Sequence, residues 1–256
     1  MKNTTFTFAL LALIILSACK NNKEQTAQIS EENMEDIVEE ANKKQNSDYL
    51  YVTATSGLSL REFDNLNSEK LAVMPYGTKL KLKLIEENET MNVGGIKGGM
   101  HQVEYNNKTG YAFNGYLSEF FPPEKNAKAE FYIDDLKATH PQATFTETVG
   151  GTASNPTNTE TVLLPTKKWH EAFYIAQKLY DIPLAFSFPN PKGRDAQTVK
   201  NPKKPDYMFS SELNVEREAN LLKTIKYTQA GEGYGSSVTI TAEGDMMKIE
   251  WTAVAD

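Results

Sequence analysis

The sequence predicts a mostly β chain in two domains: a small all-β barrel over residues 49–121, then an α+β domain over 122–256 with a largely antiparallel sheet. Three observations support this division. Short runs with strand character follow each other closely from residue 49 to 113, as in small barrels. Pro122-Pro123 then interrupts any ladder or helix. Beyond them, helical patterns alternate with strand-like runs, as expected of an α+β domain.

The first 18 residues have the layout of a secretory signal peptide. A basic Lys2 precedes an apolar stretch from Phe6 to Leu16, and small residues follow it. The alternative is a transmembrane anchor, but a bilayer requires about 20 apolar residues and this run is shorter.

The run Leu16-Ser17-Ala18-Cys19 resembles the lipobox of bacterial lipoproteins. This resemblance implies that residues 1–18 are removed and that Cys19 carries acyl chains that hold the chain on a membrane. Residues 19–48 are polar and charged, so we expect a flexible tether rather than a core of their own. In some lipoproteins of Bacteroidetes-like bacteria, acidic residues beside the cysteine resemble a surface-export signal. Lys20-Asn21-Asn22-Lys23-Glu24 contains no acidic run, which favours an outer-membrane lipoprotein that faces the periplasm.

The single cysteine and the negative net charge exclude or disfavour several classes of function. Cys19 is the only cysteine, so its lipidation leaves no thiol for a disulfide, a thiolate metal site or a cysteine nucleophile. A formal net charge of -7 makes general nucleic-acid binding a poor fit, and we expect no nucleic-acid partner. After the signal there is no second long apolar run.

The first domain is predicted from six strand-like runs. In the clearest, Thr78–Leu84, leucines alternate with threonine and lysines, as in a strand with one buried face. The runs are 49–55, 58–61, 70–74, 78–86, 100–105 and 109–113.

The order of three motifs in residues 49–121 resembles a bacterial SH3 domain. Val52–Arg61 is similar to its opening, Pro75–Leu80 to its turn into the longest strand, and Gly99–Tyr105 with Thr109–Leu117 to its close. The chain departs from that family with Ser59 where asparagine is usual, Phe63-Asp64 near a usual Gly-Pro, and Met100 where tryptophan is frequent. The resemblance implies an SH3-like barrel whose ligand is peptidoglycan or a peptide segment.

The second domain resembles no family that its motifs identify. Two helices are expected, at 125–139 and 167–181, because their apolar residues recur at helical spacing. Strands are expected at 143–149, 159–164, 221–229, 236–242 and 246–252, and a proline-marked loop at 183–205.

Two surfaces are candidates for binding. Aromatic faces contact peptide backbones and sugar rings, and an exposed groove is predicted from Phe63, Tyr76, Tyr111, Phe113 and Tyr116. The alternative is that these rings seal the barrel. A basic loop is predicted from Lys192, Arg194, Lys200, Lys203 and Lys204, which suits an acidic partner, phosphate groups or wall carboxylates, or is simply solvated.

Motifs for catalysis are absent from the sequence. The three histidines, His101, His140 and His170, do not form a His-Glu-x-x-His zinc motif, and Gly-x-Ser-x-Gly does not occur. We therefore expect no enzyme activity, metal or cofactor. The sequence favours a lipid-anchored envelope protein that binds through its SH3-like domain. The alternatives are a structural or inhibitory module that binds another envelope protein through the second domain, and a cell-wall hydrolase with an unrecognised carboxylate pair.

Overall fold

The computed structural model describes residues 48–153 and 155–255. The predicted signal peptide, Cys19 and the predicted tether up to residue 47 lie outside these residues. Residues 47–256 form one compact unit, which is mostly β and contains two seven-stranded antiparallel sheets. Within the described residues, neither helix combines the length and the apolar character that a transmembrane segment requires.

The first sheet has the strand order β3-β2-β8-β7-β4-β1-β9. Its ends, β3 and β9, are not paired with each other in the described part of the chain, so the expected closed barrel is not formed by strand pairing. The strands are β1 (Tyr49–Val52), β2 (Leu58–Arg61), β3 (Lys70–Met74), β4 (Lys79–Leu84), β7 (Met100–Tyr105), β8 (Lys108–Phe113) and β9 (Leu117–Ser118).

The core of the first sheet follows the predicted alternation at the start of β4 but not at its end, where Leu82 is half-buried and Leu84 is 60% exposed. In β4, Leu80 is fully buried between the exposed Lys79 and Lys81. Side chains from the other strands complete the interior, with no exposed surface on Val52, Leu60, Met74, Val103 and Ala112.

A separate hairpin lies between the predicted strands 78–86 and 100–105. β5 (Met91–Val93) pairs with β6 (Ile96–Gly98) across Gly94-Gly95. Both glycines have positive φ, +60° and +83°, which tight hairpin turns require and which glycine adopts without strain. A short 3₁₀-helix, η1 (Asn114–Tyr116), joins β8 to β9.

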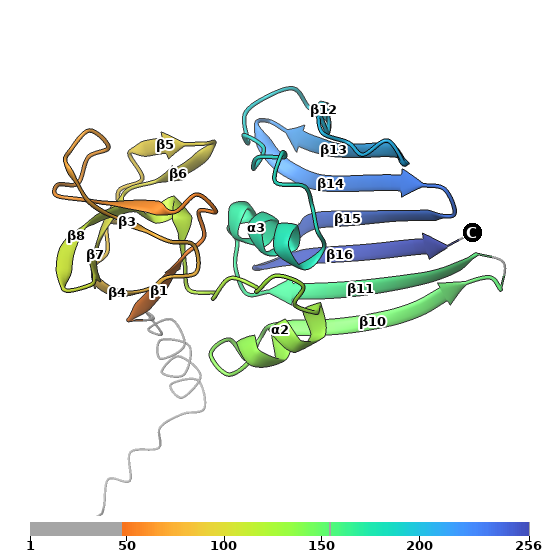
Figure 1. Ribbon diagram of the computed structural model, residues 1–256, viewed down its shortest axis with the longest axis horizontal. Helices are drawn as coiled ribbons and strands as arrows, with labels where there is room; N and C mark the ends of the chain where they lie inside the picture. The colour runs from red at the N-terminus through yellow and green to blue at the C-terminus, as the bar shows by residue number, and fades with distance from the viewer. Residues whose placement is uncertain (1–47, 154, 256) are drawn as a thin grey trace, which may run out of the picture. The chain divides into compact units, whose positions relative to one another are not determined.

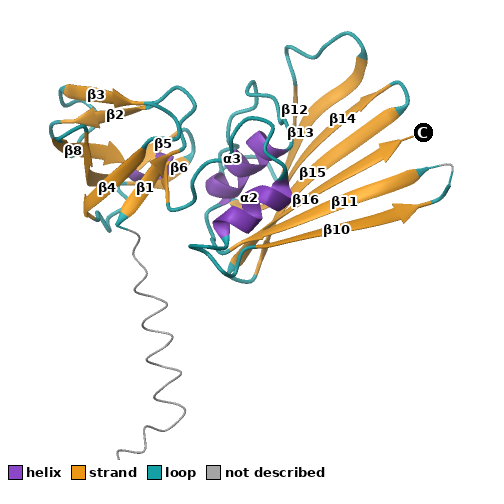
Figure 2. Ribbon diagram, turned by 60° about the horizontal axis from the view of Figure 1, so that its bottom comes forward, coloured by secondary structure: helices purple, strands orange, loops and turns teal. Residues whose placement is uncertain are grey.

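The second sheet has the order β10-β11-β16-β15-β14-β13-β12, so β11 pairs with β16 rather than with the next strand in the sequence, β12. Figures 1 and 2 show both helices on one face of this sheet. The elements are α2 (Ala129–Leu136), β10 (Thr144–Gly151), β11 (Pro156–Leu164), α3 (Trp169–Leu179), β12 (Ala196–Lys200), β13 (Met208–Glu218), β14 (Leu221–Gly231), β15 (Tyr234–Glu243) and β16 (Met246–Ala255).

These elements confirm the predicted combination of two helices with an antiparallel sheet. The prediction was wrong at the sheet edge formed by β12 and β13. β12 falls inside the predicted loop 183–205, and β13 was not predicted. The helix-facing positions of β13 alternate as Ser211, Leu213, Val215 and Arg217, all buried. Because only two of the four are apolar, the hydrophobic period of this strand is weak.

The two faces of the second sheet differ in chemistry. The helix-facing side is apolar, with Val162, Ile240 and Ile249 among its buried residues. On the opposite side a row of small hydroxyl residues crosses five neighbouring strands in register: Thr148, Thr159, Thr252, Ser237 and Thr228. A solvated polar face of this kind is common in antiparallel sheets.

Candidate functional site

A pocket of about 380 Å³ lies where the first sheet meets α3 and the segment that follows it. The first sheet contributes residues 54–59 and Arg61 on one side, and the tip of the β5–β6 hairpin on another. Met100, Phe113 and Tyr116 provide aromatic and apolar surface from β7, β8 and η1. α3 and the following segment contribute Tyr174, Gln177, Leu184, Phe186, Ser187 and Phe188.

Phe113 is held in place by two glycines. Its ring is buried, with 3% of its surface exposed. A Cβ atom at Gly98 would lie 2.9 Å from Phe113 Cε2, and one at Gly115 would lie 2.4 Å from Phe113 Cε1. Only glycine leaves room for the ring at both positions. The prediction that Phe113 shares an exposed face with Tyr111 is therefore wrong, because the chain turns into η1 directly after Phe113.

Tyr116 links the two aromatic sides of the pocket. Its ring packs edge-on against Phe113 with a centroid distance of 5.7 Å, and lies 6.2 Å from the ring of Tyr174 on α3. Burial raises the pKa of the Tyr174 hydroxyl, and the nearby Tyr116 raises it further. The Tyr174 hydroxyl therefore stays protonated and remains a hydrogen-bond donor.

The segment after α3 is fixed by one buried side chain. The amide nitrogen of Gln177 donates to the carbonyl oxygens of Pro183 (3.2 Å) and Phe186 (3.0 Å). These bonds fold residues 183–188 back over α3, where Phe188 packs on Phe173 at a centroid distance of 5.8 Å. Gln177 thereby positions two pocket-lining rings, Phe186 and Phe188.

Arg61 is the only charged side chain among the described residues that line this pocket. Its Nη1 donates to the carbonyl oxygen of Ser68 at 2.7 Å, which fixes the guanidinium at the pocket rim. A guanidinium recognises a carboxylate by paired hydrogen bonds. The pocket therefore combines an aromatic floor with one anion-binding group.

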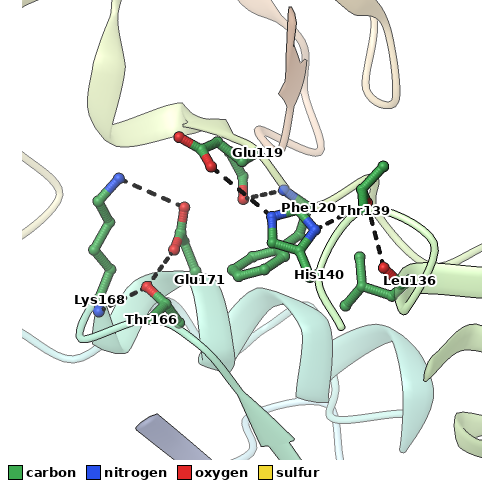
Figure 3. Close-up of polar contacts among 9 residues, drawn as sticks. Glu119, Phe120, Leu136, Thr139, His140, Thr166, Lys168 and Glu171 are labelled. Carbon is green, nitrogen blue, oxygen red and sulfur yellow. Dashed lines mark hydrogen bonds and ion pairs between the residues drawn. The ribbon is translucent and has the colours of Figure 1, made fainter. Parts of the chain in front are cut away.

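The base of α3 is held by a polar cluster (Figure 3). Thr166 Oγ1 donates to Glu171 Oε2 at 2.6 Å and accepts the backbone N–H of Lys168 at 3.1 Å. The helix begins two residues later than the predicted start at residue 167, with Lys168 at its N-cap. On the segment that leads to α2, Glu119 lies 3.8 Å from His140 Nε2, and the His140 ring packs on Phe120.

The structure separates the five predicted groove residues. Tyr116 and Phe113 line the pocket, whereas Phe63, Tyr76 and Tyr111 do not. Phe63 is 57% exposed in the loop after β2. Tyr76 lies beneath Lys178 of α3, whose Nζ is 4.7 Å from its ring centroid, and burial raises its pKa to about 12. Tyr111 packs on the core, and its hydroxyl lies 3.4 Å from Gln102 Nε2.

The predicted basic residues lie along one edge of the second sheet. Lys192, Arg194, Lys200 and Lys203 are exposed. Lys204 is half-buried, because its Nζ donates to the carbonyl oxygens of Pro205 and Met208. Lys200 belongs to β12 and lies 3.8 Å from Glu212, so it is not part of a loop.

The three histidines lie on separate elements: His101 on β7, His140 after α2 and His170 on α3. Across residues 48–153 and 155–255, no group of three or more histidine, cysteine or acidic side chains is arranged to hold a metal ion.

Sequence reasoning missed Arg61, Tyr174, Phe186 and Phe188 as pocket residues. The Phe-Ser-Phe run at 186–188, bounded by Pro183 and Pro189, was the available signal. In comparisons with known proteins, no protein-family model, no curated protein and no solved structure matches this chain.

Proposed function

We propose that this chain is a lipid-anchored, non-catalytic protein of the bacterial cell envelope that binds peptidoglycan or a peptide segment in the pocket beside α3. The lipid is carried by Cys19, and residues up to 48 act as the tether. Residues 49–121 are proposed to be an SH3-like domain on the strength of the motif order described above. The proposed location is the periplasmic side of the outer membrane.

The observation that carries this proposal is the chemistry of the pocket lining. Phe113, Tyr116 and Tyr174 offer ring surfaces for the apolar part of a peptide or sugar. Arg61 offers a cation at the rim, which suits a carboxylate on the same ligand. Peptidoglycan stem peptides and free peptide ends both present that combination.

The lining also supports binding over catalysis. Among the described residues that line the pocket, none is an aspartate, glutamate, histidine or lysine. Its serines and Thr55 therefore have no general base beside them, and nucleophilic catalysis by a hydroxyl requires one.

Retention of the full chain on purified cell-wall sacculi tests this function. Arg61→Gln removes the rim cation, and Ser187→Trp fills the mouth from an exposed position. Both are expected to reduce retention about tenfold. Lys70→Gln is the matched control, because Lys70 pairs with Arg61 across β2 and β3 but does not line the pocket. Equal retention of wild type and both pocket variants would contradict the proposal.

A second candidate is binding of another envelope protein by the second domain, and one observation favours it. Tyr207 and Phe209 are 67% and 72% exposed, and flank Met208 in the wall of another pocket of about 750 Å³. Leu184 and Lys203 also line that pocket. Large exposed apolar side chains beside basic residues are typical of protein interfaces. Co-purification of one defined partner with wild type, and its loss with Tyr207→Ser/Phe209→Ser, would support this candidate.

A further inference from the structure

A third pocket, of about 480 Å³, lies on the helix-facing side of the second sheet. It is lined by the segment that begins α2, by the end of α3, and by β10, β11 and β14–β16. It shares no lining residue with the pocket beside α3, so its chemistry is independent of the proposed function.

Acidic groups dominate this third pocket. Glu147 and Glu160 are direct cross-strand partners on β10 and β11, and Glu130 and Asp181 lie on its rim. Lys128 is the one cation in the described lining. The pKa of Glu160 is raised, first by burial and then by the negative charges of Glu147 and Glu130, although the Tyr180 hydroxyl offsets part of the rise. A bound cation would relieve this repulsion.

Two buried polar atoms beside these carboxylates have no hydrogen-bond partner in the described chain. Tyr180 is only 9% exposed and lines the pocket, yet its Oη is unpartnered. This hydroxyl interacts electrostatically with Glu160, but the contact lacks the geometry of a hydrogen bond. Asn158 Nδ2 donates to Glu147 Oε1 at 2.7 Å, which leaves Asn158 Oδ1 unpartnered. Buried polar atoms normally have partners, so the Tyr180 hydroxyl that lines this pocket and the neighbouring Asn158 Oδ1 each have unused hydrogen-bonding capacity.

An aromatic surface completes the pocket. The Trp251 ring is the cross-strand neighbour of Glu160, and stacks on Tyr180 with a centroid distance of 5.9 Å and an interplanar angle of 7°. Tryptophan faces attract organic cations through the ring quadrupole. Carboxylates and an indole face together suit a cation that carries apolar carbon as well as N–H donors.

We propose that this pocket binds the primary ammonium group of an organic ligand, with Glu147 and Glu160 as acceptors and Trp251 as the apolar wall. A primary ammonium offers three donors, which can be shared among the carboxylates of Glu147 and Glu160 and the oxygen of Tyr180. A bare metal ion fits less well, because the described acidic residues do not converge into a group that can hold one.

Calorimetric titration of the full chain with n-pentylamine tests the site, with 1-pentanol as the neutral probe of equal chain length. Amine binding is expected, and Glu160→Gln or Glu147→Gln should weaken it about tenfold. Glu216→Gln should leave it unchanged, because Glu216 is exposed on the opposite face of the same sheet. Binding of pentanol as tight as that of pentylamine, or no loss in either pocket variant, would overturn the proposal.

Tyr180→Phe separates a ligand role from a structural one. Removing a buried hydroxyl that lacks a partner should keep or raise the melting temperature, while amine affinity falls. A lower melting temperature with unchanged affinity would contradict the proposed role of this hydroxyl. A parallel titration compares glucosamine with N-acetylglucosamine. Tighter binding of the neutral sugar would make the pocket a carbohydrate site and overturn the ammonium assignment.

Discussion

Arg217 is a buried cation whose hydrogen bonds all go to neutral oxygens. It is 5% exposed on β13, and its guanidinium donates to the carbonyl oxygens of Asn190 (2.9 Å) and Arg194 (3.0 Å) and to Gln197 Oε1 (3.1 Å). Three acceptors bound by three different guanidinium nitrogens match the fork of an arginine and no other side chain. Arg217 therefore fastens residues 190–197 to the sheet.

We expect Arg217→Lys to destabilise the protein by about 3 kcal/mol, because an ammonium cannot reach all three oxygens and leaves buried acceptors unpaired. Urea unfolding measures this change. Arg194→Lys is the control, since Arg194 is exposed and its substitution should change the free energy of unfolding by less than about 0.5 kcal/mol. A similar loss of unfolding free energy in both variants would show that the three hydrogen bonds of Arg217 do not account for its contribution to stability.

His170 makes stability depend on pH. Burial lowers its pKa from 6.5 to about 4, and Lys168 lowers it while Glu171 opposes the change. Its Nε2 is also buried without a partner among the described residues. Between pH 6.5 and 4 the unfolded chain binds a proton that the folded protein does not. The stability is therefore complete above pH 6.5 and is lost as the pH falls toward 4.

The loss from this one residue should reach about 3 kcal/mol relative to a variant that cannot titrate there. Urea unfolding of wild type and His170→Gln at about pH 7.5 and about pH 4.5 measures it. The difference in stability between the two proteins should shift in favour of the variant at the acidic pH. An identical pH dependence for both would contradict the assignment.

Among the elements, η1 and β6 are built around the Phe113 ring. An alanine at Gly115 would place its Cβ 2.4 Å from Phe113 Cε1 and 2.6 Å from Ile96 Cγ2. We expect Gly115→Ala to cost about 1–3 kcal/mol, as overpacking of a buried site does. Phe113→Leu should recover part of this loss in the double variant, which a thermodynamic cycle measures.

Gly235→Ala is the matched control for that substitution. Its Cβ would meet only Gln229 O, at 3.9 Å, and the residue does not have a positive φ. Its effect on the free energy of unfolding should stay within about 0.5 kcal/mol. If Gly115→Ala changes the free energy of unfolding as little as Gly235→Ala does, the close packing of Gly115 against Phe113 does not contribute to stability.

Elements whose apolar residues recur at regular spacing were predictable from the sequence. Elements with polar residues at buried positions were not. α3 and the strand around Leu80 were found because their apolar residues recur at fixed spacing. β13 was not predicted because the polar Ser211 and Arg217 occupy inward positions. Residues distant in the sequence supply their hydrogen-bond partners. The pocket beside α3 was not predicted because its lining residues are far apart in the sequence. Arg61 and Phe188, for example, line the same pocket only in the folded chain.

At the scale of the whole molecule, several contacts join the region of the first sheet to α3 and to the segment that follows α3. Lys178 lies over Tyr76, Tyr116 packs near Tyr174, and a Cβ at Gly95 would lie 2.9 Å from Asn190 Cα. Both sheets belong to the single compact unit of residues 47–256. Dense packing of this kind couples the two sheets energetically.

We therefore expect residues 47–256 to unfold in one cooperative transition. Differential scanning calorimetry of the full chain should show a single peak, and Tyr174→Leu should lower its midpoint without splitting it. A matched substitution at the exposed Tyr207 should leave the midpoint nearly unchanged. Two resolved transitions in wild type would show that the sheets are independent.

The place of β16 in the second sheet has a consequence for how the protein is made. This strand joins the β10–β11 hairpin to the β13–β15 meander, although it follows both of them in the sequence. An isolated hairpin is only marginally stable in water. We therefore expect β10 and β11 to become stable only once β16, some 80 residues later in the sequence, has been synthesised. A stop codon just before β16 (Met246–Ala255) would therefore remove the middle of the sheet rather than shorten its edge, and would leave two fragments with exposed strand edges.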